Sequence, residues 1–495
     1  ADPPTILSLS AFCYILFHPG MVTDSSFLLS YLAVASIGYI APCLCSPWNR
    51  RKNFTDGLFT GFAVFLATLP LIVSSTHMVS SAGLVLNLIV LPMMPVLFVS
   101  AFLLFICSFL FPPLAGIFAV TVKSELYLFN RLCNGIGKLP FMNRCVKMPG
   151  TGRIIIYTTI IVSSCFFVHI LHRKLKLRRY RLINAALFDG ADTKDDVRLL
   201  SLFEKIYRGG LLVLFLLDTV FLCSSAKPAT VTFLDVGQGD GVFIRTANQM
   251  VYMIDGGSTS KTEVGKRILT PYLLYEGECE VEGWFLTHRD LDHVSGFTEV
   301  LKDERIRIRR LYLPQVLKED FEDIAREAAR NGVQVYYLDA GDRIRQEGYS
   351  FTVLSPSVKE CYEDGNAASF VLFYETSGHK YAFMGDSAEQ GEEALLKALG
   401  ENGHLDFLKC AHHGSANGSN SEALYTTLRP LISFVSCGRN NRYGHPHKEV
   451  LERIALVDST LYSTAEDGAV TVTEKAGGRF LIDPFLGRRS LCTGR

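Results

Sequence analysis

The sequence THRDLDH at residues 287–293 decides the fold of the second half of this 495-residue chain. It overlaps the end of VEGWFLTH (281–288), whose apolar centre predicts a buried strand. Four side chains of the kind that bind metal ions occur within six residues: His288, Asp290, Asp292 and His293. Because strand side chains alternate, His288 and Asp290 can point the same way, while a turn into a helix brings the other two from another side. We predict a metal site at this strand end.

The sequence around this motif predicts a soluble α/β domain. Apolar runs ending at glycine or polar turns predict strands within TVTFLDV (230–236), VFIRT (242–246) and MVYMIDGG (250–257). Helical patterns follow at 318–331 and 388–399. Alternation of strands and helices implies a sheet that is covered on both faces.

The first 226 residues predict a polytopic membrane domain instead. Residues 81–122 contain no Asp, Glu, Lys or Arg. Apolar runs long enough to cross a bilayer, about 17–25 residues, occur at 27–45, 58–75 and 153–171. The run 81–111 is too long for one straight span; Pro92 and Pro95 interrupt it, and proline breaks or kinks a helix. We favour a kinked packing helix there over part of a polar path through the membrane.

A basic run sets the expected orientation of this membrane domain. Six Lys or Arg residues lie within HRKLKLRRYR (172–181), and the positive-inside rule places them in the cytoplasm. The next apolar run, 211–223, contains Asp218. As a helix it reaches only about 20 Å, against a hydrocarbon core of about 30 Å. If it crosses, the second half of the chain lies outside the cytoplasmic membrane; if it is re-entrant, that half is cytoplasmic. We expect it to cross.

Motifs on both sides of THRDLDH extend the pattern over residues 229–485. They are FLDVGQGD (233–240), IDGG (254–257), FMGDS (383–387), HHGS (412–415) and GRNNRYGHPH (438–447). In this order they resemble the hydrolase-like domain of the ComEC DNA-uptake proteins, which implies a metallo-β-lactamase fold, an αββα sandwich. In the first half, SSFLLSYLAV (25–34) and LNLIVLP (86–92) are similar to the competence-type membrane domain of that family, although the usual Gly and Gln before Leu-Ser are absent.

The resemblance also gives expected domain boundaries. A competence-type membrane domain would occupy 1–226, a metallo-β-lactamase-like hydrolase domain 229–485 and a tail 486–495. The small N-terminal β-barrel domain and the first membrane helices of that family have no counterpart here. We therefore expect a chain whose N-terminal part is missing.

The resemblance implies the metal ligands residue by residue. His288 and Asp290 would bind a first ion, and Asp292 and His293 a second. Asp386, in FMGDS, matches the carboxylate that bridges both ions. The usual histidine of the fold's third motif has no counterpart, and NAAS (366–369) stands in that region.

Three histidines of the later motifs complete the implied site. His412 would complete the second metal site at the end of the predicted strand LDFLKCA (405–411). His413 is expected to face elsewhere, as a supporting residue or an alternative ligand. His445 resembles the late histidine of the fold and would donate to a phosphate oxygen or to the leaving group. Asp292, His413 and His445 are the expected catalytic residues.

The carboxylates suggest how the ions are held and which ions they are. Asp240 and Asp255 are expected to orient metal-bound histidines from behind, and Asp235 is expected to be structural. Asp290 stands where many relatives of the fold have His, as is usual in the ComEC branch. A hard oxygen ligand favours Mn²⁺ over Zn²⁺, with Zn²⁺ or Mg²⁺ as alternatives. Two divalent ions are the implied cofactors.

Two metal ions suit phosphodiester hydrolysis, but also lactam, thioester or phosphocholine ester cleavage. The resemblance implies DNA: the hydrolase domain would degrade one strand while the other passes through the membrane domain. Equal numbers of basic and acidic residues, 49 each, exclude a wholly basic nucleic-acid coat protein. In RIRIRR (305–310), Arg305, Arg307 and Arg309 share one strand face and could contact phosphates; a solvated edge strand fits equally well.

The expected function is thus DNA uptake across the cytoplasmic membrane by a multi-pass protein with a metal-dependent nuclease. Expected partners are single-stranded DNA, membrane lipid and other competence proteins. Two alternatives remain: a DNA channel whose hydrolase-like domain only binds DNA, and a membrane-tethered hydrolase of another ester without transport. The retained ligand set disfavours the former and the competence-type membrane half the latter.

Overall fold

The computed structural model describes residues 3–45, 54–137, 139, 142–188, 192–400, 403–487 and 489–493. The chain forms two compact units. One, the helical unit, consists of Ala1–Ser225 with Leu274–Gly277, and the other, the sandwich unit, consists of Ala226–Leu273 with Glu278–Arg495.

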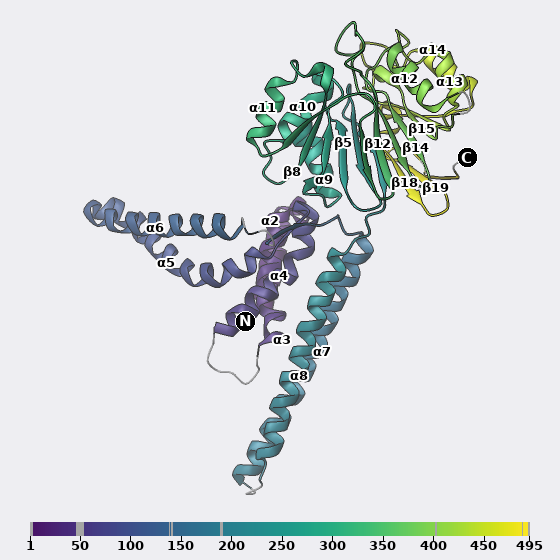
Figure 1. Cartoon of the computed structure of the whole chain (residues 1–495). Coiled ribbons are helices and arrows are strands. Elements are labelled where there is room, and N and C mark those ends of the chain that lie inside the picture. Colours follow the sequence, from purple (N-terminus) through teal and green to yellow (C-terminus); the bar gives the residue numbers. More distant parts are fainter. Residues whose placement is uncertain are drawn as a thin grey trace. The chain divides into compact units, whose positions relative to one another are not determined.

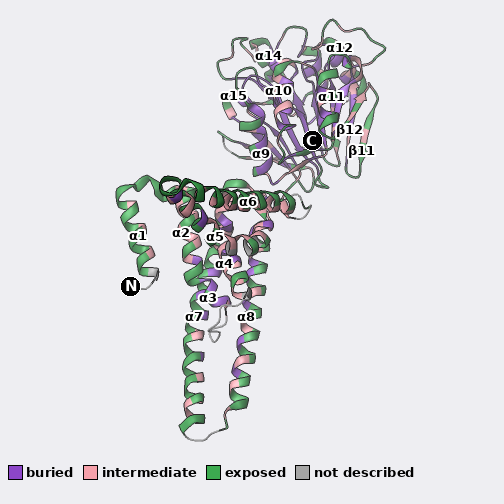
Figure 2. Cartoon of the chain, turned by 90° about the vertical axis from the view of Figure 1, so that its left-hand side faces the viewer, coloured by how far each residue is buried: buried purple, intermediate pink, exposed green. Residues whose placement is uncertain are grey.

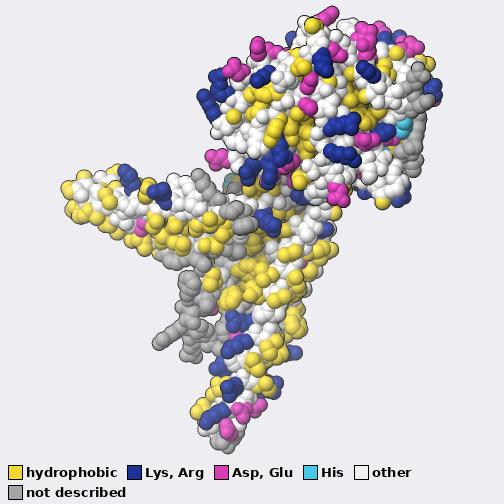
Figure 3. Space-filling view, viewed as in Figure 1, with side chains coloured by type: hydrophobic (Ala, Val, Ile, Leu, Met, Phe, Trp, Pro, Cys, Tyr) yellow, Lys and Arg dark blue, Asp and Glu magenta, His cyan; other side chains and the backbone are white. Residues whose placement is uncertain are grey.

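The helical unit is built from apolar helices. In chain order they are α1 (Pro3–Phe17), α2 (Ser25–Tyr39), α3 (Ala41–Leu44), α4 (Phe54–Thr76), α5 (Ala82–Leu110), α6 (Pro112–Gly137), α7 (Thr151–Phe188) and α8 (Lys194–Cys223). Five segments of the described residues are long and apolar enough to cross a membrane: Ser25–Leu44, Asp56–Thr76, Met93–Leu110, Thr151–Phe188 and Lys194–Cys223. Hydrophobic side chains cover much of the visible surface of this unit (Figure 3). Such a surface suits contact with lipid.

The structure answers two questions about the membrane helices: whether the prolines end the run 81–111 and whether the run 211–223 is a short helix of its own. α5 continues through positions 92 and 95, so the two prolines do not end it. The apolar run 211–223 is the C-terminal part of the 30-residue helix α8, which lies beside α7 (Figure 2). At 1.5 Å per residue α8 is about 45 Å long. The short run is therefore not an isolated helix, and its length no longer argues against a crossing.

The sandwich unit contains two facing sheets. The nine-stranded sheet has the order β10 (Gln334–Leu338), β9 (Arg310–Pro314), β7 (Gly283–Phe285), β5 (Val251–Asp255), β4 (Gly241–Arg245), β3 (Thr230–Phe233), β18 (Val470–Lys475), β19 (Arg479–Pro484) and β20 (Ser490–Thr493). The seven-stranded sheet has the order β11 (Arg343–Gln346), β12 (Tyr349–Ser355), β13 (Val371–Thr376), β14 (Lys380–Phe383), β15 (Phe407–Lys409), β16 (Ile432–Val435) and β17 (Thr460–Ser463). β20 shows that the segment expected to be a tail adds an edge strand.

Aromatic side chains fill the space between the two sheets. Phe233 stacks on Phe434 with ring centroids 3.9 Å apart, and both are buried in one cluster with side chains of both sheets. On the outer faces lie α10 (Leu291–Val300) and α11 (Glu322–Arg330) on one side, and α12 (Glu389–Leu399), α13 (Glu422–Leu428) and α14 (Lys448–Leu456) on the other (Figure 1). The predicted αββα sandwich is confirmed, and the strands and helices expected in this unit end at most four residues from their predicted ends.

Candidate metal centre

The end of β7 holds the first part of the centre through a buried carboxylate. Asp255, at the end of β5, accepts two hydrogen bonds of 2.8 Å from Thr287, one from the backbone N–H and one from the hydroxyl. Its Oδ2 also lies 2.9 Å from Nδ1 of His293. A hydrogen on Nδ1 leaves the Nε2 lone pair of His293 available to a metal ion. Asp255 thus has the expected orienting geometry, and Thr287 is a supporting residue that sequence reasoning missed.

The N-terminus of α10 does not divide the four residues of THRDLDH into the expected pairs, because His293 lies beside His288, with ring centroids 4.0 Å apart. His288 and His293 are buried, at 1% and 0% exposure. Asp290 precedes the helix without capping it, and its exposed carboxylate lies 3.7 Å from Nε2 of His288. Asp292, in the first turn, lies 3.4 Å from Nε2 of His413.

The backbone of IDGG passes so close to the first turn of α10 that its second glycine, Gly257, has no room for a side chain. A Cβ on Gly257 would lie 2.3 Å from backbone atoms of Asp292 and His293. Any side chain there would push the first turn of α10 out of place. Glycine at position 257 therefore lets α10 start directly against this motif.

The expectation that His413 faces away from the site is wrong. His412 and His413 both have left-handed backbone, with φ of 45° and 56°, which turns the second histidine inward. His413 is 2% exposed, its Nδ1 lies 2.9 Å from the carbonyl oxygen of Ser436, and its Nε2 lies 3.5 Å from Asp386. His412 is about one third exposed, with Nε2 3.8 Å from Asp386. Non-glycine residues in such strained backbone conformations cluster at active sites.

Asp386, just after β14, lies between the histidines. Its Oδ1 is 3.4 Å from Nε2 of His293 and its Oδ2 is 3.5 Å from Nε2 of His413. One carboxylate oxygen thus faces each imidazole, as a bridging ligand requires. Asp386 is 4% exposed, so its charge needs these partners.

The buried polar atoms at the centre fit a divalent cation. Among the described residues, no hydrogen bond reaches Nε2 of His288, Nε2 of His293, Nε2 of His413 or Oδ1 of Asp386. Buried polar atoms without hydrogen bonds call for an explanation, such as an ion. Ligand atoms lie within 4.8 Å of one another in four overlapping groups: His288–His293–Asp386, Asp292–His293–His413, Asp240–Asp386–His413 and Asp240–Asp255–His293. Imidazole nitrogens with carboxylate oxygens are a suitable donor set for Mn²⁺ or Zn²⁺.

The electrostatics of the centre are dominated by these carboxylates. Burial disfavours protonation of His413, but Asp386 and Asp240 raise its pKa to about 10. Burial favours the neutral form of Asp386, yet His413 and His293 hold its pKa well below the usual value. A cation bound by the same nitrogens would displace their protons.

Behind the centre lies a buried ion pair. Nζ of Lys409 donates to Oδ2 of Asp240 at 2.8 Å, and both residues are buried. The other oxygen of Asp240 is 3.7 Å from Nδ1 of His413, beyond hydrogen-bond distance. Asp240 was expected to orient a metal-bound histidine by a hydrogen bond. Instead, the carbonyl oxygen of Ser436 lies within hydrogen-bond distance of His413, and Asp240 contributes only its negative charge. Lys409 was missed, although a lysine in the apolar run LDFLKCA is a signal for a buried partner.

The centre opens into a cavity of about 350 Å³. Its walls include Asp290, Asp292, Asn366, Asp386, His412, His413, Tyr443 and His445. Asn441 fixes His445 by accepting its backbone N–H at 3.0 Å and donating to its carbonyl at 2.7 Å. Burial and the nearby His413 lower the pKa of His445 to about 4. The expected catalytic residues thus share one cavity.

The arginines of RIRIRR share one exposed face as expected: Arg305, Arg307 and Arg309 are exposed and alternate with the buried Ile306 and Ile308. The run is divided between β8 (Arg307–Ile308) and β9. Arg305 pairs with Asp303 at 2.7 Å, and Arg309 pairs with Glu280 and Glu282. Both arginine side chains are about half exposed, but their acidic partners already balance their charges, which weakens the expected role in DNA contact.

Comparison with known proteins gives the same division of the chain. Residues 1–173 match the family "Competence protein", and residues 234–430 match the metallo-beta-lactamase superfamily. ComE operon protein 3 of Bacillus subtilis (strain 168) is 26% identical over 501 residues, covering 97% of this chain and 59% of that protein.

Two further relatives match about half of this chain. Competence protein ComA of Neisseria gonorrhoeae is 31% identical over 250 residues, covering 50% of this chain and 33% of that protein. Recombination protein 2 of Haemophilus influenzae (strain ATCC 51907 / DSM 11121 / KW20 / Rd) is 28% identical over 264 residues, covering 52% of this chain and 31% of that protein. The chain therefore spans less than two thirds of each relative. A competence-protein region is thus followed by a metallo-β-lactamase-superfamily domain, and these matches support the ComEC family for this chain.

Proposed function

We propose that this chain acts in DNA uptake across the cytoplasmic membrane and that its sandwich unit is a metal-dependent phosphodiesterase that degrades the strand not transported. The observation that carries the proposal is the set of buried Nε2 atoms of His288, His293 and His413 that converge with Asp386 below an open cavity. This set suits a cation, and the cavity gives a substrate access to it.

Each residue has a separate task in this proposal. A divalent cation supplies charge neutralisation at the phosphate and lowers the pKa of water. Asp255 and Ser436 hold the rings of His293 and His413 through their Nδ1 atoms. Asp386 joins the two halves of the centre. His445, on the cavity wall, donates a hydrogen bond to a phosphate oxygen.

The proposal includes two ions, with Mn²⁺ preferred over Zn²⁺. Its support is the donor set: Asp290, Asp292 and Asp386 add hard oxygen ligands to the imidazoles. Asp290 is the most exposed of them, with 61% of its side chain accessible. It would contact an ion from the solvent side.

The proposal also places the sandwich unit outside the cytoplasmic membrane. In the antiparallel pair α7–α8, the basic run 172–181 belongs to the part of α7 nearer the connecting loop. α8 leads back from that loop and ends at Cys223. If the basic run stays in the cytoplasm, the residue that ends α8 lies on the other side. A strand would then be degraded before its partner enters.

A nuclease assay tests the proposed activity. The full chain in detergent is stripped of metal by a chelator and given Mn²⁺, Mg²⁺ or Zn²⁺ singly, with single-stranded or duplex DNA. We expect metal-dependent cleavage that survives Glu392→Gln, a change to a buried carboxylate of α12 that binds the backbone of Ser421. DNA binding without cleavage under every metal would favour the non-catalytic alternative instead.

A further inference from the structure

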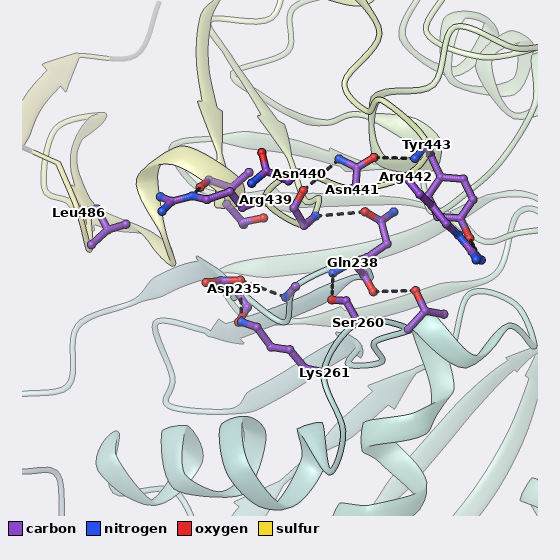
Figure 4. A pocket seen from close by; sticks show the side chains of 15 residues that line it. Asp235, Gln238, Ser260, Lys261, Arg439, Asn440, Asn441, Arg442, Tyr443 and Leu486 are labelled. Carbon is purple, nitrogen blue, oxygen red and sulfur yellow. Dashed lines mark hydrogen bonds and ion pairs between the residues drawn. The ribbon is translucent and has the colours of Figure 1, made fainter.

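A second, larger cavity of about 660 Å³ adjoins the cavity of the metal centre. Gln238, Thr259 and Tyr443 line both cavities. Figure 4 shows the segment 439–443 on one wall, with Asp235, Gln238, Ser260 and Lys261 opposite. The volume is in the range of ligand sites in proteins, about 300–1,000 Å³. None of the roles described so far uses this cavity.

The lining combines positive charge with an aromatic ring. Lys261, Arg439 and Arg442 line the cavity, and Asp235 is the single acidic residue among the lining residues. Lys261 already pairs with Asp235 at 2.9 Å. The exposed guanidinium of Arg442 lies 4.8 Å from the ring centroid of Tyr443, and Tyr443 is 45% exposed. Because the whole chain has no net charge, such a local cluster is what a polyanion would find.

One loop connects this wall with the metal centre. Asn441 bonds the carbonyl of Gly438, the backbone N–H of Tyr443 and both backbone groups of His445. Gly438 in turn donates to the side chain of Gln238 at 3.1 Å. The cationic wall and His445 are therefore held in one hydrogen-bonded arrangement, which gives a bound chain a fixed path between the cavities.

We propose that the second cavity binds a single-stranded segment of nucleic acid next to the phosphate that is cleaved. Arg439 and Arg442 contact phosphates beyond the scissile one, and Tyr443 stacks on an unpaired base where the cavities meet. An aromatic ring can stack on a base in this way when the base is unpaired, as it is in single-stranded nucleic acid. The inference rests on the proposed phosphodiesterase function and deepens it by naming the cavity and the residues that hold the strand beside the cleaved phosphate.

The test measures binding and chemistry separately on the full chain in detergent. Binding of a fluorescein-labelled oligothymidylate is followed by anisotropy in EDTA, where no cleavage occurs. Hydrolysis of bis(p-nitrophenyl) phosphate with added Mn²⁺ reports the metal centre alone. The variants are Arg439→Gln with Arg442→Gln, Tyr443→Leu and Tyr443→Phe. The matched control is Arg326→Gln with Arg330→Gln, which removes the same charge from α11.

The double variant in the cavity should weaken oligonucleotide binding at least tenfold more than it slows hydrolysis of the small ester. A plot of the logarithm of its binding constant against the logarithm of the salt concentration should become shallower, by about 0.7 in slope for each phosphate that the variant no longer neutralises. Tyr443→Leu should weaken binding at least about fivefold, while Tyr443→Phe retains it. The control double variant should match the parent in both assays.

Two results would overturn the inference: binding by the Arg439 and Arg442 double variant equal to that of the control, or binding of thymidine monophosphate as tight as that of the oligonucleotide. Failure of the proposed function looks different. In that case even the parent chain leaves the small ester intact, while the binding assay still decides whether the cavity holds a strand.

Discussion

Removing the ammonium group of Lys409 should destabilise the sandwich unit far more than removing an exposed one. Lys409 and Asp240 are 2% and 3% exposed, with Nζ and Oδ2 2.8 Å apart. Lys409→Met leaves the Asp240 carboxylate buried without its cation, which costs about 3–5 kcal/mol. Lys261 makes an ion pair of nearly the same length with Asp235, 2.9 Å, but about 40% of each side chain is exposed. Lys261→Met should cost less than about 1 kcal/mol.

Trp284 provides the assay, since it is fully buried in the sandwich unit and donates to the carbonyl of Asp255. Its fluorescence is followed during urea unfolding of the full chain in detergent, with Trp48 replaced by Phe in every variant. Adding Asp240→Asn to Lys409→Met should restore most of the lost free energy of unfolding. Equal losses for the two lysine variants would refute the account of the buried pair.

The pair also predicts a pH dependence. Burial opposes ionisation of Asp240, but Lys409 holds its pKa below the usual value. A lowered carboxyl pKa stabilises the fold fully above its unfolded value, about 3.9, and that contribution is lost as the pH falls through the folded pKa. The free energy of unfolding of the parent should fall with acid in this window. Asp240→Asn with Lys409→Met should show less of this decline.

Three further predictions concern the centre and the membrane. After chelation, Mn²⁺ should restore DNA cleavage better than Zn²⁺, because Asp290, Asp292 and Asp386 line the cavity and would add hard oxygen ligands; full restoration by Zn²⁺ alone would show that ligand hardness does not decide this site. His413→Ala should lower metal content and cleavage at least about tenfold, the cost typical of disturbing a metal site, whereas His412→Ala should have the smaller effect; the reverse order would restore His412 as the ligand. Cys361, exposed in the sandwich unit, should react in intact cells with a membrane-impermeant maleimide, and Cys361→Ser should lower the labelling of the chain. If the parent and Cys361→Ser are labelled equally while an external control protein is labelled, the sandwich unit lies in the cytoplasm.

Local sequence was sufficient for parts of the fold and the centre. THRDLDH predicted a strand end and a helix start, and the structure places His288 and His293 there, buried beside each other. Asp386 is 93 positions beyond His293, and only the order of motifs in a resembling family linked the two.

Other features depend on contacts or backbone angles that no local pattern encodes. The choice between His412 and His413 rests on two successive left-handed residues. Lys409 pairs with Asp240 across 169 positions of sequence, and Arg309, although about half exposed, pairs with Glu280 and Glu282. The apolar run 211–223 gave too short a length for its helix, because the more polar segment before it is also helical and extends α8 back to Lys194.

The most direct test of the central claim is Asp386→Ala in the full chain, with bound metal and DNA cleavage measured on the same sample. Asp386 lies between His293 and His413, at 3.4 and 3.5 Å from their Nε2 atoms. The variant should keep the buried fluorescence of Trp284 but lose bound metal and metal-dependent cleavage together. A folded Asp386→Ala chain that cleaves DNA as fast as the parent would contradict the assignment of this centre.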